Sequence, residues 1–146
     1  MLVERLGGEL DARELADYDP DALVEVFSKP PALHRFPKAM AKRVQEAARF
    51  LVDRYDGDVV QVWTGAKSGA ELVRRVAQVA GFGDQKARIF AALLGKQFGV
   101  RPRGWREATG HYGEKGSFRS VADITDDDSL RRVRAYKQEM KAAAKG

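Results

Sequence analysis

Cysteine is absent from this chain of 146 residues. The absence excludes disulfides, cysteine nucleophiles, zinc–cysteine sites and iron–sulfur clusters, because each of these needs a thiol or thiolate. Histidine is nearly absent as well, with only His34 and His111 present. We therefore expect no metal site built from side chains. We also expect no cofactor.

Long apolar runs are also missing. A membrane-spanning helix needs about 20 consecutive apolar residues, whereas the longest apolar runs in this sequence cover only a few. The opening residues, 1–5, carry charges and lack the apolar centre of a signal peptide. These features predict a soluble cytoplasmic protein with no membrane partner.

The composition favours a packed helical domain. Hydrophobic residues make up 44% of the chain, so a core is expected rather than disorder. There are 26 Lys and Arg residues against 21 Asp and Glu, a net charge of +5 that permits a polyanionic partner without proving one. No strand-like alternation of useful length occurs. The predicted fold class is therefore all-α.

Capping residues, prolines and glycines delimit the expected helices. They predict one helical domain over residues 1–125, followed by a basic helix or tail over residues 126–146. The expected helices cover residues 1–6, 11–18, 19–28, 37–55, 58–63, 68–79, 84–98, 105–109 and 130–144.

The turn Gly81-Phe82-Gly83 joins two of these helices. Glycines tolerate the backbone angles of a tight turn and leave N–H groups unshielded, while Phe82 is expected to anchor the turn in the core. The following helix starts at Asp84, where its dipole favours an anion such as a phosphate. Between Gly83 and Arg106 the only acid is Asp84, and this local excess of positive charge favours contact with phosphates. The basic residues of this stretch are Lys86, Arg88, Lys96, Arg101, Arg103 and Arg106.

Several stretches resemble one family. Residues 79–87, Val-Ala-Gly-Phe-Gly-Asp-Gln-Lys-Ala, are similar to the hairpin of the helix-hairpin-helix (HhH-GPD) base excision DNA repair glycosylase superfamily, and residues 34–40 resemble its upstream helix start. Residues 104–107 and 119–123 look like a short actinobacterial branch of the superfamily. The resemblance spans most of residues 1–130. It implies a glycosylase-like helical domain that lacks its first helices.

This resemblance implies a base excision repair protein that binds double-stranded DNA containing damaged or abasic sites, in the nucleoid. Such proteins grip the minor groove and flip a base out of the stack. Their hairpin N–H groups hold a phosphate, often with a bound monovalent cation at the hairpin backbone. The DNA-contacting residues expected here are Gly81, Phe82, Gly83, Gln85, Lys86, Arg88, Arg101 and Arg103.

The catalytic positions of the superfamily are not matched. Gln85 stands where bifunctional members carry a lysine, and an amide cannot form a Schiff base. The usual aspartate falls in a window that contains none, so Glu107 is the only carboxylate to suggest, although a surface role suits it better. Trp105 and Tyr112 are candidates for stacking on a flipped base.

Three hypotheses follow. The first is a DNA repair protein resembling monofunctional glycosylases, whose catalysis depends on a substitute such as Glu107. The second is a non-enzymatic module that binds damaged or abasic DNA. The third is a protein-interaction domain that uses the hairpin only for packing. The preferred base and the oligomeric state are left open.

Overall fold

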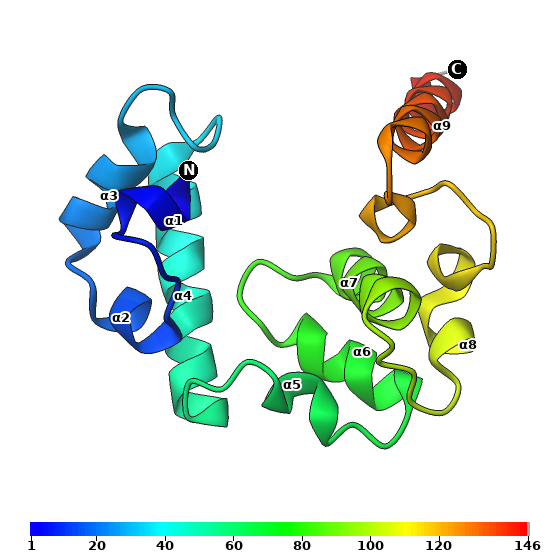
Figure 1. Ribbon diagram of the computed structural model, residues 1–146, viewed down its shortest axis with the longest axis horizontal. Coiled ribbons are helices and arrows are strands. Elements are labelled where there is room, and N and C mark those ends of the chain that lie inside the picture. Colours follow the sequence, from blue (N-terminus) through cyan, green and yellow to red (C-terminus); the bar gives the residue numbers. More distant parts are fainter. Residues whose placement is uncertain (146) are drawn as a thin grey trace. The chain divides into compact units, whose positions relative to one another are not determined.

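The structure, a computed structural model that describes residues 1–145, is helical, with no strand among those residues (Figure 1). The all-α prediction is therefore confirmed. The α-helices are α1 (Leu2–Arg5), α2 (Ala12–Asp17), α3 (Pro20–Ser28), α4 (Pro37–Tyr55), α5 (Gln61–Thr64), α6 (Gly69–Ala77), α7 (Asp84–Gln97), α8 (Trp105–Thr109) and α9 (Asp127–Lys145), with 3₁₀ helices η1 (Gly110–Gly113) and η2 (Val121–Asp123).

Side-chain caps explain where several helices begin. The Asp11 carboxylate accepts hydrogen bonds from the first-turn N–H groups of α2, and Asp19 does so for α3. The Ser68 hydroxyl accepts one from the Glu71 N–H at the start of α6. Each cap satisfies an N–H group that has no partner inside the helix. The predicted starts near residues 11, 19 and 68 are confirmed.

The helix α9 begins three residues earlier than the predicted start at residue 130. The Asp126 carboxylate accepts from the Ser129 N–H at 2.7 Å, which places the cap ahead of Asp127. That hydrogen bond is the main reason why the pKa of Asp126 lies below its ordinary value. The two 3₁₀ helices lie in stretches where the sequence predicted no helix.

The chain divides into two compact units, Met1–Thr64 with Val79–Gly81, and Gly65–Gln78 with Phe82–Gly146. The boundaries between the units follow residues 64, 78 and 81, whereas the sequence pattern places the end of the domain at residue 125, and α9 belongs to the second unit. In the first unit, α4 packs against α2 and α3 around a buried cluster that contains Leu23 and Phe27.

The second unit is organised around α7, which packs against α6, α8, η1 and η2. Small residues let these neighbours approach closely. A Cβ atom added to Gly95 of α7 would lie 2.5 Å from the Trp105 ring, and one added to Gly69 would lie 2.5 Å from the Trp105 Cα. The expected helix extends to residue 98, whereas α7 ends at Gln97, and Phe98 is its C-cap residue and 67% exposed.

Candidate nucleic-acid interface

The turn between α6 and α7 needs glycine at only one of its two glycine positions. Gly81 has a φ of +86°, in the left-handed region that favours glycine. Gly83 has a φ of −86° and a ψ of −176°, an extended conformation that any residue adopts. The sequence argument that both glycines serve the backbone angles of the turn is therefore wrong at Gly83.

Packing does not require a glycine at position 83 either. A Cβ atom added there would have nothing within 4 Å. Gly83 is the N-cap residue of α7, and no side chain caps this helix. The residues from Gly83 to Lys86 are all exposed. The first-turn N–H groups of the 14-residue helix α7 are therefore exposed, and no side chain at the N-cap covers them.

Phe82 anchors the turn to α7 rather than to the buried core. Its side chain is half-buried, and its ring meets the Phe90 ring edge-on, with centroids 5.7 Å apart. The aromatic pair holds the turn against α7 on the side of Phe90. The sequence predicted an anchor in the core, whereas the Phe82 side chain is only half-buried.

The side chains of α7's first turns have different surroundings. Gln85 donates a hydrogen bond to the Tyr112 hydroxyl at 2.9 Å, so its amide holds η1 against α7. Arg88 forms an ion pair with Asp84 at 3.0 Å, which offsets part of its charge. Lys86 is exposed and, among residues 1–145, forms no ion pair. Of these three predicted contacts, Lys86 keeps its full charge available to a polyanion.

The arginines that follow α7 also divide into two kinds. Arg101 donates from Nε to the Gly95 carbonyl at 2.9 Å and lies 5.9 Å from the Trp105 ring, so it holds the end of α7. Arg106 lies 4.4 Å from the same ring and donates to the Gly113 carbonyl at 2.6 Å. Arg103 is exposed, and within residues 1–145 only its backbone carbonyl is engaged, by the Gly69 N–H.

The two candidates for base stacking are buried. Trp105 is 8% exposed and Tyr112 is 9% exposed. Gly95 leaves room for the Trp105 ring and Gly69 for its backbone, and Gln85 holds the Tyr112 hydroxyl. Neither ring has a face open to a flipped base in this conformation. Their burial argues against the stacking prediction and gives both residues a packing role.

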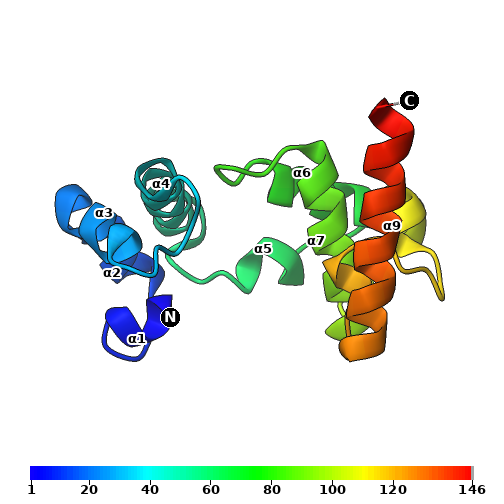
Figure 2. The same cartoon turned by 90° about the horizontal axis from the view of Figure 1, so that it is seen from above.

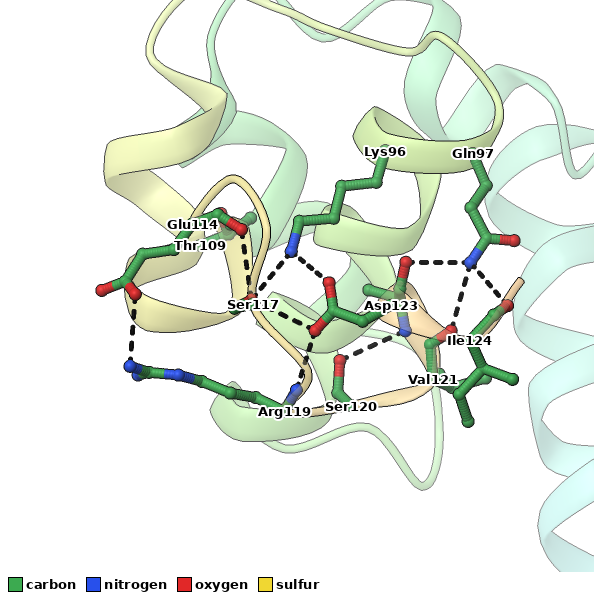
Figure 3. A network of polar contacts seen from close by, with 12 residues as sticks. Lys96, Gln97, Thr109, Glu114, Ser117, Arg119, Ser120, Val121, Asp123 and Ile124 are labelled. Atoms are coloured by element: carbon green, nitrogen blue, oxygen red, sulfur yellow. Dashed lines mark hydrogen bonds and ion pairs between the residues drawn. The ribbon is translucent and has the colours of Figure 1, made fainter. Parts of the chain in front are cut away.

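Two carboxylates of the second unit, those of Glu107 and Asp123, differ in their surroundings. Glu107 is exposed on α8, and no hydrogen bond to its carboxylate exists within residues 1–145. The Asp123 side chain is only 4% exposed and forms an ion pair with Lys96 of α7. Figure 3 shows that Asp123 also accepts hydrogen bonds from the Ser117 hydroxyl and the Arg119 N–H.

The sequence did not predict this Lys96–Asp123 network. The two partners lie 27 residues apart, and no local pattern links them. The network ties η2 and the loop before it to α7. Gln97 donates to the carbonyls of Val121 and Ala122 in η2, the latter at 2.8 Å, and to that of Ile124 just after it (Figure 3). The Asp123 carboxylate therefore stabilises the packing of η2 against α7.

Among residues 1–145 no three His, Asp or Glu side chains gather in a way that could hold a metal ion. In the same residues no helix is both long and apolar enough to cross a membrane. Comparison with protein-family models, with curated proteins and with solved structures found no match.

Proposed function

We propose that this chain binds double-stranded DNA through the start of α7, as a base excision repair protein that prefers damaged or abasic sites. The observation that carries the proposal is the uncapped and open N-terminus of α7. Glycine occupies position 83 although neither its backbone angles nor its neighbours require one. A glycine at this position is explained if a ligand has to reach the backbone N–H groups, because glycine has no side chain to block it.

A DNA phosphate suits this place. The unpaired N–H groups of the first turn and the helix dipole both favour an anion. The exposed side chain of Lys86 adds a positive charge within the first turn. Such contacts position a protein on DNA without reading its sequence. The resemblance of residues 79–87 to the hairpin of DNA glycosylases supports the same partner.

We propose further that this chain excises a damaged base, and that this activity depends on the Glu107 carboxylate. A glycosylase needs a carboxylate that stabilises the cationic sugar or activates water. Gln85 excludes the lysine route, and Asp123 is engaged by Lys96. Hydrolysis by this chain would therefore use Glu107, and Glu107→Gln should abolish excision while DNA affinity stays unchanged.

The burial of Trp105 and Tyr112 favours a second candidate, a module that binds distorted or abasic DNA without excising a base. A binding module needs the phosphate contact but no stacking pocket. Single-turnover assays on duplexes that carry different damaged bases separate the two functions. Release of any base by the wild type, lost in Glu107→Gln, selects the enzyme.

The binding test compares a labelled duplex containing an abasic-site analogue with the same duplex intact, across a series of salt concentrations. We expect tighter binding to the abasic duplex and an affinity that falls steeply with salt. Gly83→Val, whose side chain has open space around its Cβ, should reduce that affinity without unfolding the chain. Equal affinity for both duplexes would reduce the proposal to general DNA binding, and no binding at low salt would refute it.

A further inference from the structure

Within residues 1–145, the contacts that fix α9 to the second unit lie in the first half of the helix. The Ser129 hydroxyl accepts hydrogen bonds from the Thr125 and Asp126 N–H groups at 2.8 and 2.9 Å. Val133 is 1% exposed, and Tyr136 is half-buried with the Arg119 guanidinium 5.8 Å from its ring. These contacts place the first half of α9 firmly in the unit.

The second half of α9 has no cover from the rest of the described chain. Every residue from 137 to 145 is exposed. Figure 2 shows this end of the helix extending past α6 and α7 of the same unit. Alanines at 142–144 and the other good helix formers there keep the segment helical without tertiary contacts.

Five basic residues share one face of α9. They occur at intervals of three or four residues, which at about 100° per residue places them within a sector of about 120°. Asp127 of the first turn lies in the same sector, whereas Glu139 lies on the opposite side of the helix. We call this set the basic stripe: Arg131, Arg134, Lys137, Lys141 and Lys145.

The basic stripe is not arranged as a merely solvated surface. Like charges three and four residues apart destabilise a helix, and an exposed face is better served by acids placed between them. Glu139, the one acid in the exposed half, has alanines at positions 135 and 143, where a basic partner would stand. No ion pair within residues 1–145 involves a residue of the stripe.

The dimensions of the stripe match a DNA strand. From Arg131 to Lys145 the helix rises about 21 Å, at about 1.5 Å per residue. One strand of B-DNA presents a phosphate about every 3.4 Å along its axis, or about six over this length. Because the strand winds around that axis while the helix is straight, the stripe meets only part of these phosphates at once. A phosphodiester backbone would relieve the repulsion between the stripe residues by neutralising them.

We infer that the basic stripe of α9 is a second DNA contact, which lies along the phosphate backbone and acts independently of the α7 N-terminus. The inference rests on the proposed function in its choice of partner. The stripe reads no base edges in this role. Its effect is to raise affinity for any duplex, while preference for a damaged site resides elsewhere.

The test compares two charge-matched variants of the full chain. The stripe variant is Arg134→Gln, Lys137→Gln, Lys141→Gln, in which glutamine preserves helix propensity. The control variant is Lys29→Gln, Arg54→Gln, Lys67→Gln, whose exposed side chains lie outside α7 and α9. Both lose three positive charges, so a difference between them reflects location rather than net charge. Far-UV circular dichroism checks that α9 remains helical.

Binding to an intact labelled duplex is measured across a salt series, with Gly83→Val as a third variant. We expect the stripe variant to lower the slope of log K against log salt by about 2 to 3, close to 0.9 for each lost phosphate contact, and the control by less than 1. At about 0.1 M salt this corresponds to a loss of roughly a hundredfold in affinity.

The outcomes separate this inference from the proposed function. Equal slopes for the stripe and control variants would overturn the inference, and a weakened Gly83→Val would then leave the proposed function standing. The converse result, a weakened stripe variant with Gly83→Val unchanged, keeps the stripe and refutes the contact at α7. Binding of the wild type to vesicles containing phosphatidylserine, without binding to the duplex, would refute both.

Discussion

Gly83→Asp should raise the stability of the protein and remove its DNA binding at the same time. The extended backbone of Gly83 has the angles that N-cap residues adopt, and its Cβ position is empty. An aspartate there can accept hydrogen bonds from the first-turn N–H groups of α7, as Asp11 does in α2. The same carboxylate would then occupy and repel the proposed phosphate site.

The magnitude follows from known capping energies. Aspartate exceeds glycine as an N-cap by a few tenths of a kcal/mol, and a negative charge at an exposed helix N-terminus adds about 0.3 to 1 kcal/mol. The neighbouring Asp84 carboxylate opposes part of this gain. We therefore expect a net stabilisation of about 0.5 kcal/mol, which raises the Tm by roughly 1 to 2 °C.

The assay combines thermal unfolding with binding to the abasic duplex, and it needs a control for charge. Ala70→Asp places the same charge in the exposed first turn of α6, at the end of that helix away from the turn. We expect it to leave affinity within about threefold of the wild type, because exposed charges separated by more than about 10 Å are largely screened in 0.1 M salt.

Two results would refute the reasoning in different places. If Gly83→Asp lowers the Tm, the N-cap geometry assigned to Gly83 is wrong. If the variant is stabilised and still binds DNA as tightly as Ala70→Asp does, the start of α7 holds no phosphate. Only stabilisation together with lost binding supports the proposed site.

Three further predictions concern the fold. Gly95→Ala should destabilise by about 1 to 3 kcal/mol, seen as a lower urea midpoint, because the added methyl group meets the Trp105 ring. Lys96→Met should cost about 3 to 5 kcal/mol by leaving the buried Asp123 carboxylate unpaired, and adding Asp123→Asn should restore part of it; no recovery would contradict the pairing. The Ser129 N–H lowers the folded-state pKa of Asp126 below 3.8, so its stabilising effect is complete above 3.8 and is lost as the pH falls through the folded pKa. Asp126→Asn should therefore be less stable than the wild type at pH 7 and equal to it in strong acid, as denaturant titrations at several pH values would show.

Local chemistry was enough to predict most of the helices. A carboxylate or hydroxyl such as that of Asp19 or Ser68 caps the N–H groups two or three residues ahead, and a proline fixes the angles of a first turn. These interactions act within a few residues, so the sequence displays them directly. The predicted boundaries of α3 and α4 therefore agree with the structure.

The candidate site was predictable only in outline. The sequence placed a glycine turn before a basic stretch, and that turn leads into α7. It could not distinguish Gly81, which the backbone requires, from Gly83, which it does not, because the φ angle depends on how the flanking helices are joined. Nor could it show that Gln85 and Arg101 are engaged by their own unit.

The sequence by itself determined the all-α class, the positions of the caps, the turn and the periodicity of charge along α9, since each depends on neighbours along the chain. The tertiary structure alone decided which side chains are enclosed. Trp105 is buried because Gly69 and Gly95 leave room for it, and Asp123 is held because Lys96 reaches it from α7. Such contacts join residues far apart in the chain, where only packing brings them together.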